Sequence, residues 1–510
     1  MGTTVHTVHK RALVLSTLIV ASCGLGYELI DGALSSYLLG DSILQFSSVI
    51  GCYLFAMGVG SWLSKYIDDD DVLDRFVDIE LLVGLFGGIS AAVLFAVFAW
   101  ISAPFRAALY AFVLALGMLV GMEIPLVMRA FWQRREALRE TVSSVLTFDY
   151  LGSLVVSLIF PLVLAPRLGL LRTGFLFGIL NALVALTATH IFRDQLCAIH
   201  RKTAGAVFII GLLASGFITS GQLTRLAEHG IYGDEIVYAK TTPYQRILIT
   251  QWRDDMRLYL NGNLQFSSRD EYRYHEALIH PVLESLPWAK NVLVLGGGDG
   301  LAVREILRHQ NIEHVTLVDL DPAMTTLFST SAPLVKLNGG SLKNPKVTVI
   351  NDDAVRWLES NTDVFDSIVA DFPDPTNFGL GRLYSVPVFR LFARHLSEHG
   401  YAVIQSTSPY FAPHAFWTIV ATLRDAGLHT WPYHCYVPSF GDWGFVIASH
   451  RADFTPPTHY SVPTRWLDAQ TTADMFHFPA DMPALSMPPN HLNDQPLVRL
   501  FDEDWKHVLR

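Results

Sequence analysis

Charged residues are scarce in this chain. Only 16% of its 510 residues are Asp, Glu, Lys or Arg, whereas about 25% is usual in soluble proteins. Hydrophobic residues make up 51%, and the mean hydropathy is +0.32. A chain this apolar is neither disordered nor purely soluble, because disordered and soluble chains contain few long hydrophobic runs.

Cysteine and positive charge are also in short supply. The four cysteines are too few and too scattered for a disulfide framework: Cys23, Cys52, Cys197 and Cys435. The net charge is -10 and the isoelectric point is near 6.0. We therefore expect no nucleic-acid partner, because phosphate binding needs a basic face. The acidic balance favours a cationic substrate, and we predict no metal site.

Long apolar runs fill the first part of the chain. Each is roughly 20 residues long, which is the length that a helix needs to cross a bilayer. Lys10 and Arg11 precede the first run, but this run is too long for a signal peptide and no small-residue cleavage site follows. We predict a multi-pass transmembrane domain over residues 1–225, with about seven spans: 12–39, 43–66, 76–100, 106–128, 143–165, 170–192 and 203–221.

Five acidic residues lie inside these predicted spans: Glu28, Asp31, Glu80, Glu123 and Asp149. A carboxylate at the bilayer centre costs about 2.5 to 3.5 kcal/mol on insertion scales, so each should face the interior of the helix bundle. Two interpretations stay open, namely hydrogen bonding between helices and a path or site for a polycation. The first is favoured, because no spacing matches a carrier motif.

The orientation of these spans is contradictory. If the N-terminus lies inside, the inside loops carry most of the Lys and Arg residues, as expected for cytoplasmic loops. Seven spans would then place the rest of the chain outside, away from cytosolic nucleoside cofactors. We give cofactor supply precedence and predict an inner-membrane protein with its catalytic domain in the cytoplasm.

The second half of the chain reads as a soluble α/β protein. Strands at 231–238, 246–250 and 257–260, with a turn at Asn261–Gly262, predict a small β-strand domain over 226–285. Further strands then alternate with helices, at 291–295, 314–320, 346–350, 365–370, 401–405 and 443–449. This alternation predicts a Rossmann-like, doubly wound sheet over 286–460, with its ligand at the carboxyl ends of the strands. Residues 461–510 are a C-terminal extension.

A glycine loop follows the first strand of that sheet. It reads Gly296-Gly297-Gly298-Asp299-Gly300 and lacks the spacing of G-x-G-x-x-G. A carboxylate at the start of the next helix would repel a pyrophosphate, so NAD and FAD are disfavoured. The loop instead favours a ligand with a cationic group.

Acidic residues follow the next two strands. Asp319 ends one strand, where a carboxylate can hold ribose hydroxyls. Asp353, after Asp352, is placed to accept a hydrogen bond from an adenine amine. Each could equally be a helix N-cap. Together with Asp299 they favour a nucleoside that carries a positive sulfonium.

The loop after the fourth strand holds two more acids, Asp371 and Asp374, in the sequence Asp-Phe-Pro-Asp-Pro. Two prolines restrict this loop, so the carboxylates keep a defined separation. One carboxylate of such a pair can anchor an ammonium group while the other accepts a proton. The alternative is a rigid loop with solvated acids.

In combination, these motifs resemble the spermidine synthases, which are polyamine aminopropyltransferases. The resemblance covers about residues 232–450, and bacterial versions fused to membrane helices resemble the whole chain. The matching stretches are Tyr244-Gln245, Asn261-Gly262 with Gln265, 270–276, 296–300 with Arg304-Glu305, 319–321, Asp353, 371–375 and Gly444-Phe445.

The resemblance implies a role for each matching residue. The nucleoside of decarboxylated S-adenosylmethionine, a co-substrate rather than a permanent cofactor, would be held by Gln245, Asp319, Asp353 and Ala354, beside the loop glycines Gly296 and Gly298. The aminopropyl arm would meet the acceptor near His275 and Asp299. The acceptor itself would be served by the proton acceptor Asp371, the polyamine-binding Asp374 and the lining residue Tyr274.

Two departures from the family pattern concern the substrates. Ala354 stands where a glycine is usual, and residues 376–381 replace a common Gly-Pro pair. We expect aminopropyl transfer to an amine, foremost putrescine, giving spermidine and 5′-methylthioadenosine. The alternatives are an S-adenosylmethionine-dependent methyltransferase and a membrane polyamine transporter or sensor whose soluble domain only binds. The expected partners are the small amine and the lipid bilayer, and a homo-oligomer stays open.

Overall fold

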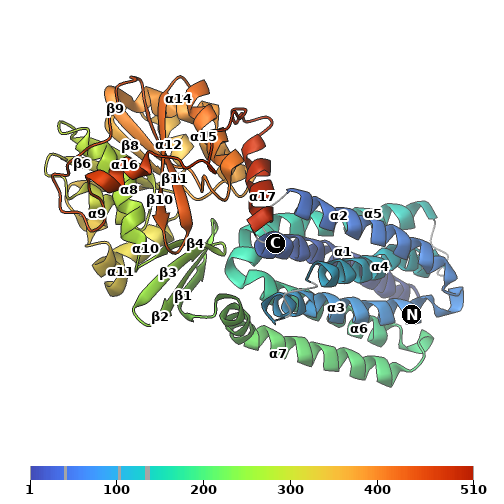
Figure 1. The fold of residues 1–510 in the computed structure, drawn as a ribbon. Coiled ribbons are helices and arrows are strands. Elements are labelled where there is room, and N and C mark those ends of the chain that lie inside the picture. Colours follow the sequence, from blue (N-terminus) through green and yellow to red (C-terminus); the bar gives the residue numbers. More distant parts are fainter. Residues whose placement is uncertain (1, 40–42, 101–104, 133–137, 509–510) are drawn as a thin grey trace. The chain divides into compact units, whose positions relative to one another are not determined.

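The computed structural model describes residues 2–39, 43–100, 105–132 and 138–508 (Figure 1). The chain divides into two compact units, Met1–Ile236 and Val237–Arg510, here called the helical unit and the α/β unit. Each unit is described by itself.

The helical unit is a bundle of long helices (Figure 1). Each of the seven predicted spans falls largely on one of them. A short π-helix, η3 (Phe160–Leu168), links the fifth helix to the sixth. The helices are α1 (Gly2–Leu39), α2 (Ile43–Leu63), α3 (Val72–Trp100), α4 (Phe105–Trp132), α5 (Leu138–Ile159), α6 (Gly169–Ile191) and α7 (Ile199–Tyr232).

Within the described residues, six helical stretches are long and apolar enough to cross a membrane. One of them, Arg139–Ile191, contains nearly all of α5 together with η3 and α6. The hydroxyl of Ser22 on α1 donates to the Gly152 carbonyl at 3.0 Å, and the neighbouring Cys23 thiol contacts the Phe177 carbonyl at 3.6 Å. A straight helix would separate residues 152 and 177 by about 37 Å. The chain therefore turns back between them, and α5 and α6 are separate helices.

Buried acids in the bundle find polar partners on other helices. Glu80 on α3 accepts a hydrogen bond of 2.9 Å from the Asn181 side chain on α6. Ser90 on α3 donates to Asp31 on α1 at 3.4 Å. For these two acids the structure supports hydrogen bonding between helices.

The α/β unit begins within the first strand of a four-stranded sheet, whose order is β1-β2-β3-β4. Its strands are β1 (Glu235–Thr241), β2 (Arg246–Trp252), β3 (Asp255–Leu260) and β4 (Asn263–Ser267). The predicted strand at 231–238 starts too early, because α7 continues to Tyr232. Asn261 and Gly262 form the predicted turn, with φ angles of 50° and 86° that suit a tight hairpin.

The large sheet has seven strands in the order β10-β11-β9-β8-β5-β6-β7. The strands from β9 to β7 in this order are parallel, and β11 is antiparallel to both of its neighbours. This is the predicted Rossmann-like sheet. Its strands are β5 (Asn291–Gly296), β6 (His314–Asp319), β7 (Val347–Asn351), β8 (Phe365–Asp371), β9 (Leu396–Gln405), β10 (His429–Val437) and β11 (Gly441–Ser449).

Helices cover both faces of the large sheet (Figure 1). Along β5, Val292 and Val294 join one hydrophobic core, whereas Leu293 and Leu295 join the other, as the two-residue period of a strand requires. The helices are α8 (Glu271–Glu284), α9 (Leu301–Ile306), α10 (Pro322–Thr330), α11 (Ala332–Leu337), α12 (Ala354–Ser360), α13 (Phe378–Gly381), α14 (Val386–His395), α15 (Pro413–Asp425), α16 (Ala469–Met475) and α17 (Pro496–Val508).

The C-terminal extension is part of this fold. Leu467, just before α16, and Met475, at its end, belong to one core of the sheet. Leu497 and Phe501 of α17 belong to the other. The described part of the extension, residues 461–508, therefore completes the hydrophobic cores of the α/β unit.

Candidate active site

Acidic residues gather at the carboxyl edge of the large sheet. Strand β5 lies between β6 and β8, and Gly296 at its end pairs in register with Asp371 at the end of β8. Asp319 ends β6 on the other side. The glycine loop after β5 is therefore flanked by a carboxylate from each neighbouring strand, as predicted from the strand ends.

The glycine loop lies against both flanking carboxylates. The backbone N–H of Gly298 donates to Oδ2 of Asp319 at 3.0 Å. A Cβ atom at Gly298 would stand 2.6 Å from the Asp319 carboxyl carbon, and one at Gly297 would stand 2.9 Å from Oδ2 of Asp371. Side chains at these two positions would push the acids away, so glycine is needed for the close approach.

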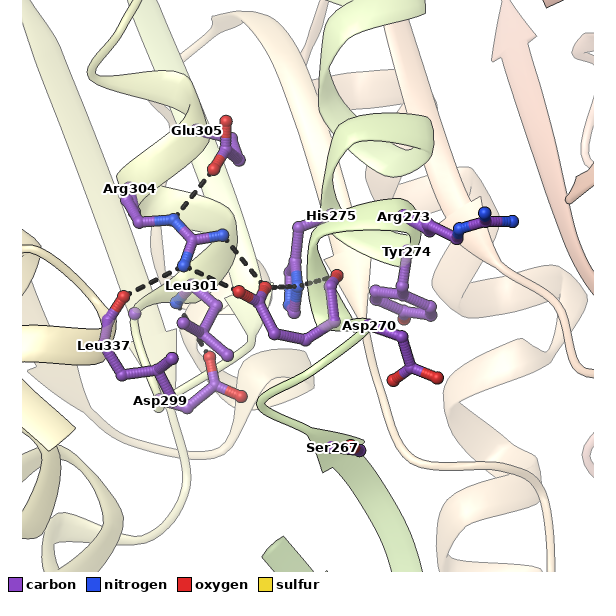
Figure 2. A network of polar contacts seen from close by, with 12 residues as sticks. Ser267, Asp270, Arg273, Tyr274, His275, Asp299, Leu301, Arg304, Glu305 and Leu337 are labelled. Atoms are coloured by element: carbon purple, nitrogen blue, oxygen red, sulfur yellow. Dashed lines mark hydrogen bonds and ion pairs between the residues drawn. The ribbon is translucent and has the colours of Figure 1, made fainter. Parts of the chain in front are cut away.

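Asp299, the acid within this loop, bonds to the start of the helix that follows. Its Oδ1 accepts a hydrogen bond of 2.9 Å from the backbone N–H of Leu301, the first residue of α9 (Figure 2). Burial raises the pKa of the Asp299 carboxyl to about 6; the positive charge of His275 opposes this shift, and the negative charge of Asp371 adds to it. Asp299 thus lies within electrostatic reach of both residues.

Tyr274 and Asp371 are joined directly. The Tyr274 hydroxyl, on α8, donates to Oδ1 of Asp371 at 2.6 Å. Burial raises the pKa of Asp371, while His275 and the Tyr274 hydrogen bond lower it. Burial, together with the charge of Asp371, raises the pKa of Tyr274 well above its usual value. The tyrosine therefore keeps its proton and orients the carboxylate.

His275, next to Tyr274 on α8, belongs to a charged network (Figure 2). Its Nδ1 lies 2.8 Å from Oε2 of Glu271, and Arg304 binds both Glu271 oxygens at 2.9 Å. Arg304 also donates to Glu305 at 2.8 Å and to the Leu337 carbonyl at 2.9 Å. Burial alone would lower the pKa of His275, but the hydrogen bond and charge of Glu271 outweigh it and raise the pKa.

Asp374 lies in the loop after β8, and two side chains at and just after the end of β9 bind its carboxylate. Its Oδ1 accepts a hydrogen bond of 3.0 Å from Gln405, the last residue of β9, and its Oδ2 accepts one of 3.4 Å from Thr407. Burial raises the pKa of Asp374 to about 7, although both hydrogen bonds lower it. This carboxyl has no cationic partner among the described residues, so an ammonium group could supply its counter-charge.

A tyrosine fixes the loop that carries both acids. The Tyr384 hydroxyl lies 3.2 Å from the Phe372 carbonyl and 3.0 Å from the Pro373 carbonyl. Gln405 donates to the Phe372 carbonyl as well, at 3.0 Å. The loop is therefore rigid, but its two acids are half-buried rather than solvated. This disfavours the alternative that the motif is only a rigid loop with solvated acids.

Two of the predicted nucleoside-binding residues, Asp319 and Gln245, both form a hydrogen bond with Asp321. Asp319 accepts hydrogen bonds from Gly298 and from the backbone N–H of Asp321, and burial raises its pKa to about 6. The Gln245 side chain donates to Asp321 at 3.2 Å, and Thr242 donates to the same oxygen at 2.8 Å. Gln245 is thereby anchored beside the segment that follows β6.

Asp353 acts here as a helix cap. Its Oδ1 accepts hydrogen bonds from the backbone N–H groups of Val355 and Arg356, at 3.0 and 3.1 Å, and its Oδ2 pairs with Arg382. Ala354 is the first residue of α12. No described contact links Asp353 to the other predicted site residues, so its role toward adenine stays a prediction.

Four further residues support the site, although the sequence alone assigns them no role: Glu271, Arg304, Gln405 and Tyr384. Glu271 and Arg304 fall in the stretches that carry the resemblance, but their pairing cannot be derived from spacing. Gln405 ends a predicted strand at the carboxyl edge, which is a usable signal. Tyr384 has no such signal. Among the described residues, no group of three or more His, Cys, Asp or Glu is arranged to hold a metal ion.

Comparison with protein families places a known domain over this site. Residues 271–457 match the spermine/spermidine synthase domain. This stretch contains the α8 residues, the glycine loop and the acids that end β6 and β8.

Comparison with whole proteins extends the similarity to nearly all of the chain. It is 60% identical to polyamine aminopropyltransferase 2 of Ralstonia nicotianae, over 98% of this chain and 99% of the relative. It is 49% identical to the polyamine aminopropyltransferase of Leptospira interrogans, over 98% and 100%. A crystal structure of a spermidine synthase in complex with the transition-state analogue AdoDATO is 22% identical, with a TM-score of 0.46, over 48% of this chain and 86% of that one.

Proposed function

The chain belongs to the polyamine aminopropyltransferase family, and on that premise we propose that it moves an aminopropyl group from decarboxylated S-adenosylmethionine to putrescine. The products would be spermidine and 5′-methylthioadenosine. The observation that carries the proposal is the hydrogen bond of 2.6 Å between Tyr274 and Asp371 beside the glycine loop. It leaves an oriented carboxylate available as a proton acceptor.

We assign the donor to the edge formed by β5, β6 and β7. Asp319 would bind the ribose hydroxyls, which is a common role for an acid at this strand end. Gln245, Asp353 and Ala354 would complete the nucleoside site. Asp299 supports a sulfonium donor, because its charge favours a cation at the glycine loop and disfavours a pyrophosphate.

The acceptor amine is assigned to Asp374. A half-buried carboxyl whose pKa is raised to about 7 gains a counter-charge when an ammonium group enters. The diamine would then be anchored at one end by Asp374, while its other nitrogen reaches Asp371. Because the rigid loop fixes the separation of Asp374 and Asp371, it would determine which length of diamine fits.

In the reaction, the amine nitrogen would attack the carbon bonded to the sulfonium sulfur. A C–N bond forms, the C–S bond breaks, and its electron pair goes to sulfur, which leaves as the neutral thioether of methylthioadenosine. An amine with a pKa near 10.4 is mostly protonated at pH 7, and deprotonating it costs about 5 kcal/mol. Asp371 would accept this proton, Tyr274 would orient Asp371, and His275 would balance the negative charge of Asp299 and Asp371.

Family membership favours aminopropyl transfer over methyl transfer from S-adenosylmethionine, since the similar relatives are named aminopropyltransferases. It also favours an enzyme over a transporter or sensor that only binds polyamine. The test is to incubate the full-length protein in detergent with decarboxylated S-adenosylmethionine and putrescine, spermidine or 1,3-diaminopropane, and to follow methylthioadenosine release. Methylation with the intact donor, without methylthioadenosine from the decarboxylated one, would contradict the proposal.

We further propose that the helical unit inserts into the inner membrane and that the α/β unit lies in the cytoplasm. Six long apolar helical stretches support insertion, and the cytosolic supply of the nucleoside donor supports this orientation. A reporter fused after Arg510 tests the orientation, and a periplasmic signal would overturn it.

A further inference from the structure

The helical unit contains a cavity of about 200 Å³, lined only by residues of that unit. Its walls come from α1, α2, α4 and α5. Along α1 the lining extends from Thr17 to Glu28, which corresponds to about 16 Å of helix. A single water needs about 10–15 Å³ of such space, so this elongated cavity can admit a small organic molecule.

The charged groups of the cavity are all acidic. Glu28 comes from α1, Glu123 from α4 and Asp149 from α5, and none of the described residues that line the cavity is Lys, Arg or His. The Glu123 side chain is only 3% exposed, and its Oε1 has no hydrogen-bond partner in the described part of the chain. Leaving a buried carboxyl oxygen unpaired is costly. A cationic donor entering the cavity would remove that cost.

The remaining walls are largely apolar. They are formed mainly by Val20, Ala21, Leu25, Leu54, Met57, Val120, Ile124 and Val127. The hydroxyl of Tyr53 donates to the Gly24 carbonyl at 2.9 Å, so its oxygen can only accept a further hydrogen bond. Small inorganic cations prefer a shell of six or more oxygens. Carboxyls from three helices, together with largely apolar walls, match instead an amine whose ammonium groups are joined by methylene groups.

We propose that this cavity binds a diamine or polyamine in its ammonium form, with Glu123 anchoring one ammonium group and the apolar walls packing against the methylene chain. The carboxyls of Glu28 and Asp149 serve the remaining nitrogens. The choice of a polyamine among organic cations of this size rests on the proposed aminopropyl transfer. The bundle then holds an amine site of its own, in addition to the acceptor site at Asp374.

The test measures binding of radiolabelled putrescine and spermidine to the full-length protein in detergent by equilibrium dialysis, without donor, so that no turnover occurs. The Asp374→Asn variant weakens the site in the α/β unit, and we expect about one saturable site per chain to remain. Adding Glu123→Gln should weaken this remaining site at least tenfold. Adding Asp70→Asn, which removes an exposed acid of the same unit outside the cavity, should leave it unchanged.

A second variant keeps the test valid if Glu123→Gln does not fold. Ala21→Leu leaves every carboxyl in place but narrows the cavity, and it should weaken the same binding at least tenfold. Uncharged 1,4-butanediol should not compete. The cavity proposal is overturned if no saturable site remains in Asp374→Asn, if Glu123→Gln and Ala21→Leu bind normally, or if Na⁺ displaces the amine at equal concentration.

Methylthioadenosine release by the wild-type protein is measured separately. Normal release without binding in the cavity rejects only the cavity site. Binding in the cavity without release rejects only the proposed function.

Discussion

Gly297 and Asp371 approach each other so closely that a Cβ atom at the glycine would stand 2.9 Å from the carboxylate oxygen Oδ2. Gly297 also has a backbone φ angle of 66°, which residues with a side chain rarely adopt. We therefore expect Gly297→Ala to displace Asp371 and to lower kcat by at least tenfold. Steady-state methylthioadenosine release measures the loss.

Gly427→Ala provides the matched control for this glycine. Gly427 has a φ angle of 92°, but a Cβ atom there would meet nothing within 4 Å. It should cost some stability and leave kcat unchanged. Equal activity of the two variants would show that the approach of Gly297 to Asp371 is not needed.

Asp371→Asn tests the proton acceptor. The amide keeps the size of the side chain and can accept from Tyr274, but it cannot take a proton at neutral pH. General-base catalysis contributes about 10² to 10⁴ in rate, so kcat should fall by this order. Donor binding, measured by equilibrium dialysis, should change little. Asp363→Asn, at an exposed acid just before β8 and so away from the carboxyl ends of the strands, should behave as the wild type.

The strand ends were predictable because buried parallel strands form continuous apolar runs, and the acids that follow them stand out. Asp319 and Asp371 were found in this way. Strand β10 was missed because it contains Pro432, which marks an edge strand, and β10 is the edge of the sheet.

Pairings between distant residues were not predictable from one sequence. Arg304 and Glu271 are 33 residues apart, and nothing in their spacing requires the two hydrogen bonds that join them. Asp353 shows a second limit, because a helix cap and a ligand-binding acid leave the same sequence signal. In the structure the capping contacts of Asp353 are present, whereas its predicted ligand role is untested.

Tyr274→Phe should change the pH dependence of the reaction. The hydrogen bond from Tyr274 lowers the pKa of Asp371, so its removal raises that pKa further. Asp371 must be ionised to accept a proton, and the acidic limb of kcat/KM should therefore move to higher pH. An unchanged limb, measured from pH 5 to 9, would show that Asp371 is not the titrating base.

Asp374→Asn should affect the acceptor more than the donor. The change removes the charge that is proposed to bind the ammonium group but leaves an oxygen to accept from Gln405. We expect KM for putrescine to rise at least tenfold, with donor KM changed by less than twofold. A normal putrescine KM would place the acceptor elsewhere.

The same substitution should alter the pH dependence of stability. The folded-state pKa of Asp374 is raised to about 7 from an ordinary value of 3.8. Such a group contributes stability that is complete below about pH 4 and is lost as the pH rises through about 7. The amide of the variant stays neutral throughout, so Asp374→Asn should raise Tm relative to the wild type at pH 8 but not at pH 4. A Tm difference that is independent of pH would contradict the raised pKa.

The α/β unit should fold without the helical unit. Its two hydrophobic cores consist entirely of its own residues, and the C-terminal helices complete them. Strand β1 begins at Glu235, so a fragment of residues 234–510 keeps both sheets whole. We expect this fragment to be soluble, to unfold cooperatively and to release methylthioadenosine with free putrescine at a rate close to that of the full chain.

Aggregation of the fragment, with the full-length protein well behaved in detergent, would show that the helices are required for folding. A folded fragment with little turnover would instead show that the bundle takes part in delivering the amine, whereas full turnover would leave it the role of an anchor or a separate amine-binding unit.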